Sequence, residues 1–202
     1  MATVSACAAL LAGQDTSCET PKRRYYQQAV VINKADIDPT SVTITKTDYE
    51  VPTPTCYYNV QFSLKEGKTG YKFIGPANGS NFFGTTDKTT SDLGFPQYKH
   101  NANLLLIGAT ESAKCILEAL DKGSFVVAYQ FTDGTVEIYG FENGVSTGDY
   151  SYDVQGGGGG SAIILSSNDN APENYLPLIY KSGTLGGEEA DFDSAFENPV
   201  TP

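Results

Sequence analysis

The chain has 202 residues, of which 40% are hydrophobic, and its 13 tyrosines and 10 phenylalanines supply large side chains for a core. This size suits one domain, and the aromatic content excludes wholesale disorder. The formal charge of −11 repels phosphate groups, so the composition also excludes a protein that grips nucleic acid or an anionic membrane surface.

The first residues do not resemble a secretion signal, because no basic residue precedes the short run of small residues at 2–13. No later stretch approaches the roughly 20 apolar residues that span a bilayer. The cysteines are spread singly, which favours free thiols in a reducing compartment over a disulfide framework. We therefore expect synthesis in the cytoplasm and no membrane partner. The cysteines are Cys7, Cys18, Cys56 and Cys115.

The first third of the chain is rich in strand signals. After a short helical segment at 2–13, residues 25–33 are strand formers, and the next strand places Val42 and Ile44 on one face and threonines on the other. Residues 56–64 alternate more clearly, which predicts a half-buried strand. Its core face is expected to carry Cys56, Tyr58, Val60, Phe62 and Leu64, and its other face Tyr57, Asn59, Gln61 and Ser63.

Residues 65–95 are rich in Gly, Asn, Thr and Lys, and we expect a long loop excursion there with at most a hairpin of its own. A helix is predicted at 110–123. Thr110 is a suitable N-cap, and Gly123 lies where the helix should end. Its apolar stripe consists of Ala113, Ile116, Leu117 and Leu120.

The strongest local signal is a hairpin at 125–139. Two strand-type runs flank Asp133 and Gly134, a dipeptide that accepts positive φ at both central positions of a tight turn. Residues 146–154 alternate again, and 161–167 provide a last strand after five consecutive glycines. In total, the sequence predicts at least six strands, mostly antiparallel, and one helix that packs on a sheet.

These elements form a single β-rich domain at 1–181. The remaining residues, 182–202, are acidic with few aliphatic side chains, and we expect them to form a C-terminal arm.

The residue types do not point to catalysis. His100 is the single histidine and is expected at the surface, while Cys115 is expected in the core without a neighbouring cation. The acidic pairs at 188–189 and 191–193 lack the fixed loop of a calcium site. We therefore expect a structural protein and neither an enzyme nor a metal or cofactor site.

From the helix onward, the order of elements resembles the C-terminal half of tail tube proteins of tailed bacteriophages, particularly of phages that infect Bacteroidetes. In that family a helix ending in Gly precedes a hydrophobic strand, a D-G or N-G turn, a second strand, a Gly-rich loop and a closing strand followed by Pro. Residues 23–44 are similar to the N-terminal strand of the same family. The residues that fit the pattern are Gly123, Asp133, Gly134, Gly140, Gly144, Gly148 and Pro172.

The resemblance implies an antiparallel β-sandwich or partial barrel flanked by one helix, whose copies join edge to edge into stacked hexameric rings. It implies a virion tail protein, made in the host cytoplasm, with its own copies and the tape-measure, terminator and baseplate or hub proteins as partners. Double-stranded DNA would pass through an acidic channel in non-specific transit. The long strands at 57–64 and 125–131 would supply the pairing edges. Candidates for lining the channel are Asn59, Gln61, Glu137, Asp149 and Asp153.

The consecutive glycines are interpreted as a hinge that lets the last strand reach a neighbouring sheet, with an exposed loop as an equal alternative. They are Gly156, Gly157, Gly158, Gly159 and Gly160. Two other functions stay open. One is another ring-forming tail or neck component. The other is a receptor- or carbohydrate-binding β-sandwich module of a phage fibre or adhesin, with an aromatic platform of Tyr57, Tyr150 and Tyr152, unless these tyrosines pack at subunit contacts.

Overall fold

The computed structural model of the protein describes residues 25–47, 57–75, 82–107, 110–150 and 160–200. Strands make up 46% of the described residues and helices 15%, which confirms a mainly β fold with a flanking helix. The strands are β1 (Tyr25–Asn33), β2 (Thr43–Thr47), β3 (Tyr57–Gln61), β4 (Tyr71–Ile74), β5 (Phe83–Thr90), β6 (Pro96–Ile107), β7 (Phe125–Phe131), β8 (Val136–Tyr139), β9 (Val145–Thr147), β10 (Gly160–Ser167) and β11 (Leu178–Tyr180). The helices are α1 (Glu111–Lys122) and α2 (Glu188–Asp193), and a 3-10 turn, η2 (Lys34–Asp36), follows β1.

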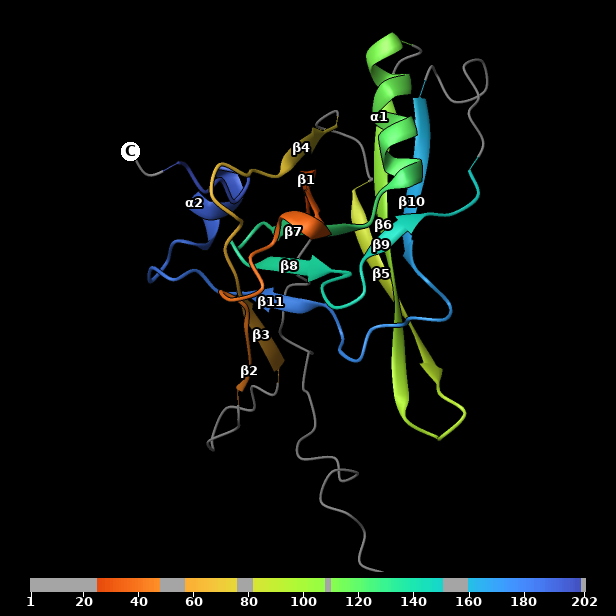
Figure 1. Ribbon diagram of the computed structural model, residues 1–202, viewed down its shortest axis with the longest axis vertical. Helices are drawn as coiled ribbons and strands as arrows, with labels where there is room; N and C mark the ends of the chain where they lie inside the picture. Colours follow the sequence, from red (N-terminus) through yellow and green to blue (C-terminus); the bar gives the residue numbers. More distant parts are fainter. Residues whose placement is uncertain (1–24, 48–56, 76–81, 108–109, 151–159, 201–202) are drawn as a thin grey trace, which may run out of the picture.

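All described strands belong to one mixed sheet with β7 at its centre. β7 pairs with β1 and β8 along its length and with β9 at Phe125. Through β9 the sheet continues into β10, β6 and β5. Figure 1 shows the result, in which β5, β6 and β10 run along the long axis of the molecule while β7, β8 and β11 lie across it. The pairing of β11 with β3 is parallel, and the other described strand pairs are antiparallel.

Two hydrophobic clusters lie on the two faces of the central strands. On β7, Val127 and Tyr129 belong to the first cluster, and Val126 and Ala128 to the second. Residues of β6, β10 and α1 complete the first cluster, whereas residues of β3 and the C-terminal segment complete the second. Because both faces of β7 are covered, its sequence is an almost unbroken apolar run.

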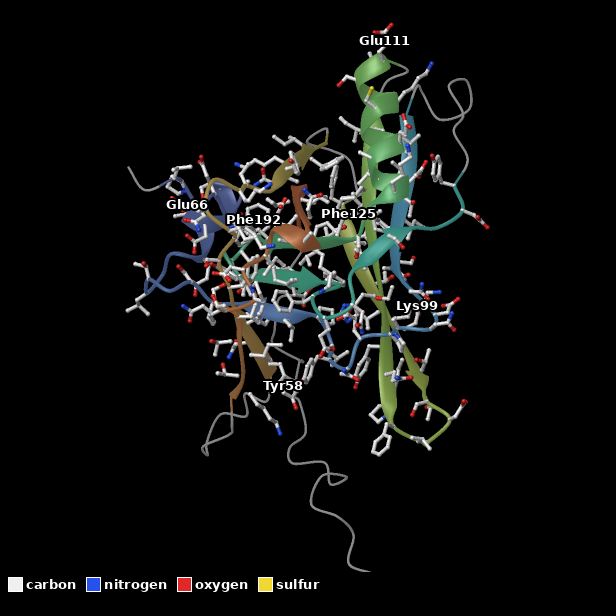
Figure 2. All side chains as sticks on the ribbon, in the orientation of Figure 1. Tyr58, Glu66, Lys99, Glu111, Phe125 and Phe192 are labelled. Atoms are coloured by element: carbon white, nitrogen blue, oxygen red, sulfur yellow. The ribbon has the colours of Figure 1, made fainter. Side chains whose placement is uncertain are left out.

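The C-terminal residues are part of the fold, so the predicted arm at 182–202 is wrong. Phe192 of α2 is completely buried, and the Phe196 ring stacks on Phe62 of the segment after β3 at 5.4 Å. In Figure 2, Phe192 lies where α2 meets the central strands. The hydroxyl of Tyr180 donates a hydrogen bond to Asp191 at 2.8 Å. Two phenylalanines four residues apart are enough to anchor a segment that otherwise has an acidic composition.

The predicted loop excursion at 65–95 contains two strands, β4 and β5, and is therefore also wrong. β5 pairs with β6 over eight residue pairs, which makes a long hairpin that closes through the turn at 91–95. Most β5 side chains are exposed on both faces. A strand that buries neither face has no alternating apolar pattern, so composition alone misses it.

The helix and the central hairpin agree with the prediction, with two refinements. The Thr110 hydroxyl caps α1 by accepting from the Ala113 N–H at 3.2 Å. Within the apolar stripe Ala113, Leu117 and Leu120 are buried, but Ile116 reaches the surface. In the hairpin turn only Gly134 has positive φ, because the turn is of the type that ends in one left-handed residue and a bulge.

The free edges of the sheet lie elsewhere than predicted. β3 is placed between β2 and β11, and β7 is placed between β1 and β8, so neither is an edge. Within the described part of the chain, the strands with a single partner are β2, β4 and β5. β9 ends at Thr147, so residues 148–150 of the predicted strand at 146–154 are not in a strand, and residues 151–154 lie outside the described residues.

Candidate functional site

The predicted channel-lining residues do not form one surface. Glu137 and Asn59 share a row of the sheet, since Glu137 pairs with Ile179 and Ile179 pairs with Asn59. Asn59 is nevertheless buried, so its placement on a solvent-facing side is wrong. Glu137 and Ile179 instead line a crevice together with Thr86 of β5.

The other predicted residues are dispersed. Gln61 and Asp149 are exposed, Gln61 at the end of β3 and Asp149 after β9, in different parts of the sheet. Asp153 and the glycines from 156 to 159 lie outside the described residues, and Gly160 is the first residue of β10. The described glycine of the proposed hinge is therefore part of a strand that pairs with Ile107.

An aromatic crevice, which we call the tyrosine crevice, separates the central strands from the β5–β6 hairpin. Its volume is about 650 Å³, and its tyrosines are Tyr58, Tyr98, Tyr139 and Tyr175. The Tyr58 and Tyr175 rings lie 4.5 Å apart. The Tyr139 hydroxyl donates to Glu137 Oε2 at 3.0 Å, which places a carboxylate among the rings. Such a combination can stack on a flat ligand and hold its polar groups.

The predicted aromatic platform is not the one that the structure forms. The Tyr150 hydroxyl donates to Asp121 Oδ2 of α1 at 2.9 Å, so this ring is tied to the helix. Tyr152 and the Tyr57 side chain lie outside the described part of the chain. The tyrosines that gather in the structure come from four separate segments, and no sequence window contains them together.

His100 is buried with its ring 5.5 Å from the ring of Tyr139, so its predicted place at the surface is wrong. Its Nδ1 accepts from the Gly140 N–H at 3.1 Å, and its Nε2 lies 3.0 Å from the Tyr175 carbonyl oxygen. A carbonyl cannot donate, so the proton of the neutral ring sits on Nε2. Burial lowers the pKa of His100 to about 4, which keeps the ring neutral at physiological pH. Both ring nitrogens are used in packing β6 against two loops.

A buried carboxylate orders the loop between β8 and β9. Glu173 accepts from the backbone N–H groups of Glu142 and Asn143 at 2.8 and 2.9 Å. The Lys34 ammonium lies close enough to interact with it and donates to the Phe141 carbonyl at 2.8 Å. Burial raises the pKa of Glu173 and lowers that of Lys34. Since the carboxylate oxygens hold backbone donors, this cluster stabilises the loop rather than serving as a reactive site.

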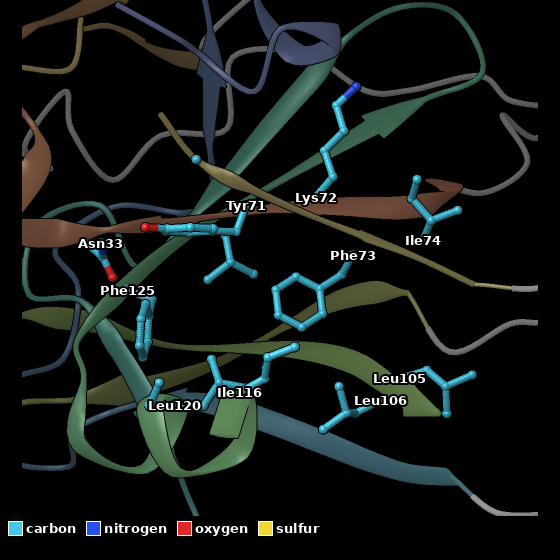
Figure 3. A pocket seen from close by; sticks show the side chains of 13 residues that line it. Asn33, Tyr71, Lys72, Phe73, Ile74, Leu105, Leu106, Ile116, Leu120 and Phe125 are labelled. Carbon is cyan, nitrogen blue, oxygen red and sulfur yellow. The ribbon is translucent and has the colours of Figure 1, made fainter. Parts of the chain in front are cut away.

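A second hollow, which we call the β4–α1 groove, lies where edge strand β4 faces the flanking helix. Its volume is about 810 Å³. Its walls are Phe73 of β4, Leu105 and Leu106 at the end of β6, and Ile116 and Leu120 of α1. Figure 3 shows Phe73 and Ile116 directed into the space between strand and helix. The groove is therefore an exposed extension of the first hydrophobic cluster, next to an edge strand.

The described residues contain few groups suited to chemistry. Cys115 lies on the exposed side of α1, which corrects its predicted place in the core, because helical spacing puts it on the opposite side of the helix from the buried Ala113, Leu117 and Leu120. No group of three His, Cys, Asp or Glu residues close enough to share a metal ion occurs among the described residues. Neither described helix has the length and apolar character needed to cross a bilayer.

Comparisons with known proteins found no match to the chain among protein-family models, curated proteins or solved structures.

Proposed function

We propose that the chain is a structural subunit that assembles with copies of itself, as in the bacteriophage tail tubes that its sequence resembles. The observation that carries the proposal is the edge strand β4, which has one described partner strand and borders the apolar β4–α1 groove. An unprotected edge beside an apolar hollow is a hazard for a monomer. In an assembly the same edge is covered by the next copy.

The charge of the chain is compatible with passive transit of DNA. Six copies in a ring would carry a formal charge of −66, six times the −11 of one chain. An acidic wall makes no counterion-releasing contacts with phosphates, so it does not hold a duplex that passes. Of the candidate channel residues, Gln61 and Asp149 are exposed, in different parts of the sheet.

The proposal is tested by imaging the purified full chain. Negative-stain electron microscopy and sedimentation velocity, across a hundredfold range of concentration, should reveal rings or tubes with a central channel. A strictly monomeric chain over the whole range would contradict the proposal.

A second candidate function, a carbohydrate-binding module, is favoured by the tyrosine crevice. Tyrosine rings stack on the apolar faces of sugars, and the Glu137 carboxylate can accept hydrogen bonds from sugar hydroxyls. Binding of a glycan by the monomeric chain, lost in a Tyr98→Ala variant, would favour this function over assembly. If the wild-type chain forms rings and binds no glycan on an array, the result would favour assembly.

A further inference from the structure

The turn of the β5–β6 hairpin forms an apolar knob. Leu93 is 84% exposed and Phe95 is 65% exposed. The turn has a fixed shape, because the Ser91 N–H donates to the Phe95 carbonyl at 2.9 Å and the Phe95 N–H donates to the Ser91 hydroxyl at 3.0 Å. Gly94 supplies the positive φ of +83° that the turn requires. The ordered turn thus keeps two large apolar side chains exposed to solvent.

The knob and the β4–α1 groove lie at opposite ends of the same strand. Pro96, the first residue of β6, follows the knob directly, and Leu105 and Leu106 near the other end of β6 line the groove. Ten residues of strand span roughly 33 Å. Figure 1 shows the hairpin turn and α1 at the two ends of the molecule. A knob cannot reach the groove of its own chain, so any contact between the two joins separate copies.

We infer that the hairpin knob of one copy docks in the β4–α1 groove of a second copy. The inference rests on the proposed self-assembly and names the surfaces that carry one contact. The groove volume of about 810 Å³ lies within the range of roughly 300–1,000 Å³ that holds a drug-sized ligand, which is ample for a leucine and a phenylalanine side chain. Docking covers both exposed apolar features at once.

The apolar walls that receive the knob carry no charged side chain. Lys72 is the single charged residue among those that line the groove, but it pairs with Val30 of the second hydrophobic cluster, so its side chain leaves β4 on the face opposite to Phe73. Figure 3 shows the Lys72 side chain directed away from the apolar walls. Docking of Leu93 and Phe95 in the groove therefore buries no charge.

The contact is head to tail. It uses two different surfaces of the chain, so each copy that docks leaves a free knob and a free groove for the next. Because the two surfaces lie at the ends of β6, copies related by this contact repeat along the long axis of the molecule. Such a contact produces an open series of copies and not a closed dimer.

The first test compares assembly of the full chain with that of a Leu93→Ser/Phe95→Ser variant by sedimentation velocity. Both side chains are exposed, so the variant should fold as the wild type does, which thermal unfolding at low concentration checks. For the variant, we expect the onset concentration of assembly to be at least tenfold higher than for the wild type. The matched control is Leu185→Ser, because Leu185 is also fully exposed but lies far along the chain in the C-terminal segment, and it should leave assembly unchanged.

The second test identifies the surfaces directly. A benzophenone amino acid in place of Phe95 should form cross-links to peptides from β4 or α1 of a second copy, located by mass spectrometry. Cross-links confined to other peptides, or assembly that is unaffected by the Leu93→Ser/Phe95→Ser change, would overturn this contact while leaving self-assembly intact. A wild-type chain that stays monomeric would overturn the proposed function itself.

Discussion

At the scale of single residues, His100 makes stability depend on pH. Its pKa is about 4 in the fold against 6.5 for the free side chain, chiefly because burial disfavours the charged ring. The folded-state pKa is lowered, so the stabilisation is complete above pH 6.5 and is lost as the pH falls from 6.5 toward 4. Between pH 7.5 and pH 5 the loss should be about 2 kcal/mol.

Urea unfolding at several pH values measures this dependence. Because carboxyl groups also titrate near pH 5, the informative quantity is the difference between the wild type and a His100→Gln variant. The variant lacks the titrating ring, so its free energy of unfolding should fall less steeply over this interval. Equal slopes for the two proteins would show that His100 is not held neutral in the fold.

Gly123 is a second residue whose environment fixes its identity. It follows α1, and a Cβ at this position would lie 2.0 Å from the Phe125 ring. Its φ of −100° is accessible to alanine, so the obstacle is the ring and not the backbone. Gly123→Ala should therefore destabilise the fold by about 1–3 kcal/mol through displacement of Phe125. Gly148→Ala is the matched control, because nothing lies within 4 Å of a Cβ there, and chemical denaturation of both variants separates the two cases.

At the scale of elements, the C-terminal segment is the clearest case in which composition misleads. Phe192 and Phe196 are buried against β3 and the central strands. Phe192→Ala should cost about 3–5 kcal/mol of unfolding free energy, which is the usual loss for a buried phenylalanine. Phe95→Ala removes the same side chain from an exposed turn and should cost less than about 0.5 kcal/mol at a concentration where the chain is monomeric. Similar losses in both variants would mean that the segment does not pack as described.

The elements that the sequence reveals are those that bury one face or have a strong local cap. β3 and the segment that follows it show their core face through Val60, Phe62 and Leu64, and α1 shows its start through Thr110. The hairpin of β7 and β8 is marked by Gly134. These patterns are local, so they survive without knowledge of the remaining chain.

The elements that the sequence conceals depend on partners far away in the chain. β5 has no apolar face, because its strand pairing with β6 and not burial holds it in place. Asn59 has the alternation of an outward residue, but it is buried in a strand that pairs on both sides, with β2 and with β11. The tyrosine crevice likewise combines β3, β6, β8 and the loop before β11. Tertiary contacts of this kind leave no trace in residue periodicity.

At the scale of the whole molecule, net charge and apolar contact act against each other in assembly. Each copy carries a formal charge of −11, so bringing copies together is opposed by repulsion that salt screens. The knob and the groove are mainly apolar, and their contact is not weakened by screening. Assembly should therefore strengthen as the sodium chloride concentration rises from 50 to 500 mM, with onset at a concentration several-fold lower.

Sedimentation velocity at the two salt concentrations measures this shift, and the Leu93→Ser/Phe95→Ser variant provides the comparison. If apolar docking drives assembly, the wild type should assemble more strongly at high salt, while the variant should stay monomeric at both salt concentrations. Dissociation of the wild type at high salt would mean that ion pairs between copies outweigh their mutual repulsion, and the subunit contact would then have to be sought among the charged surfaces of α1 and β5.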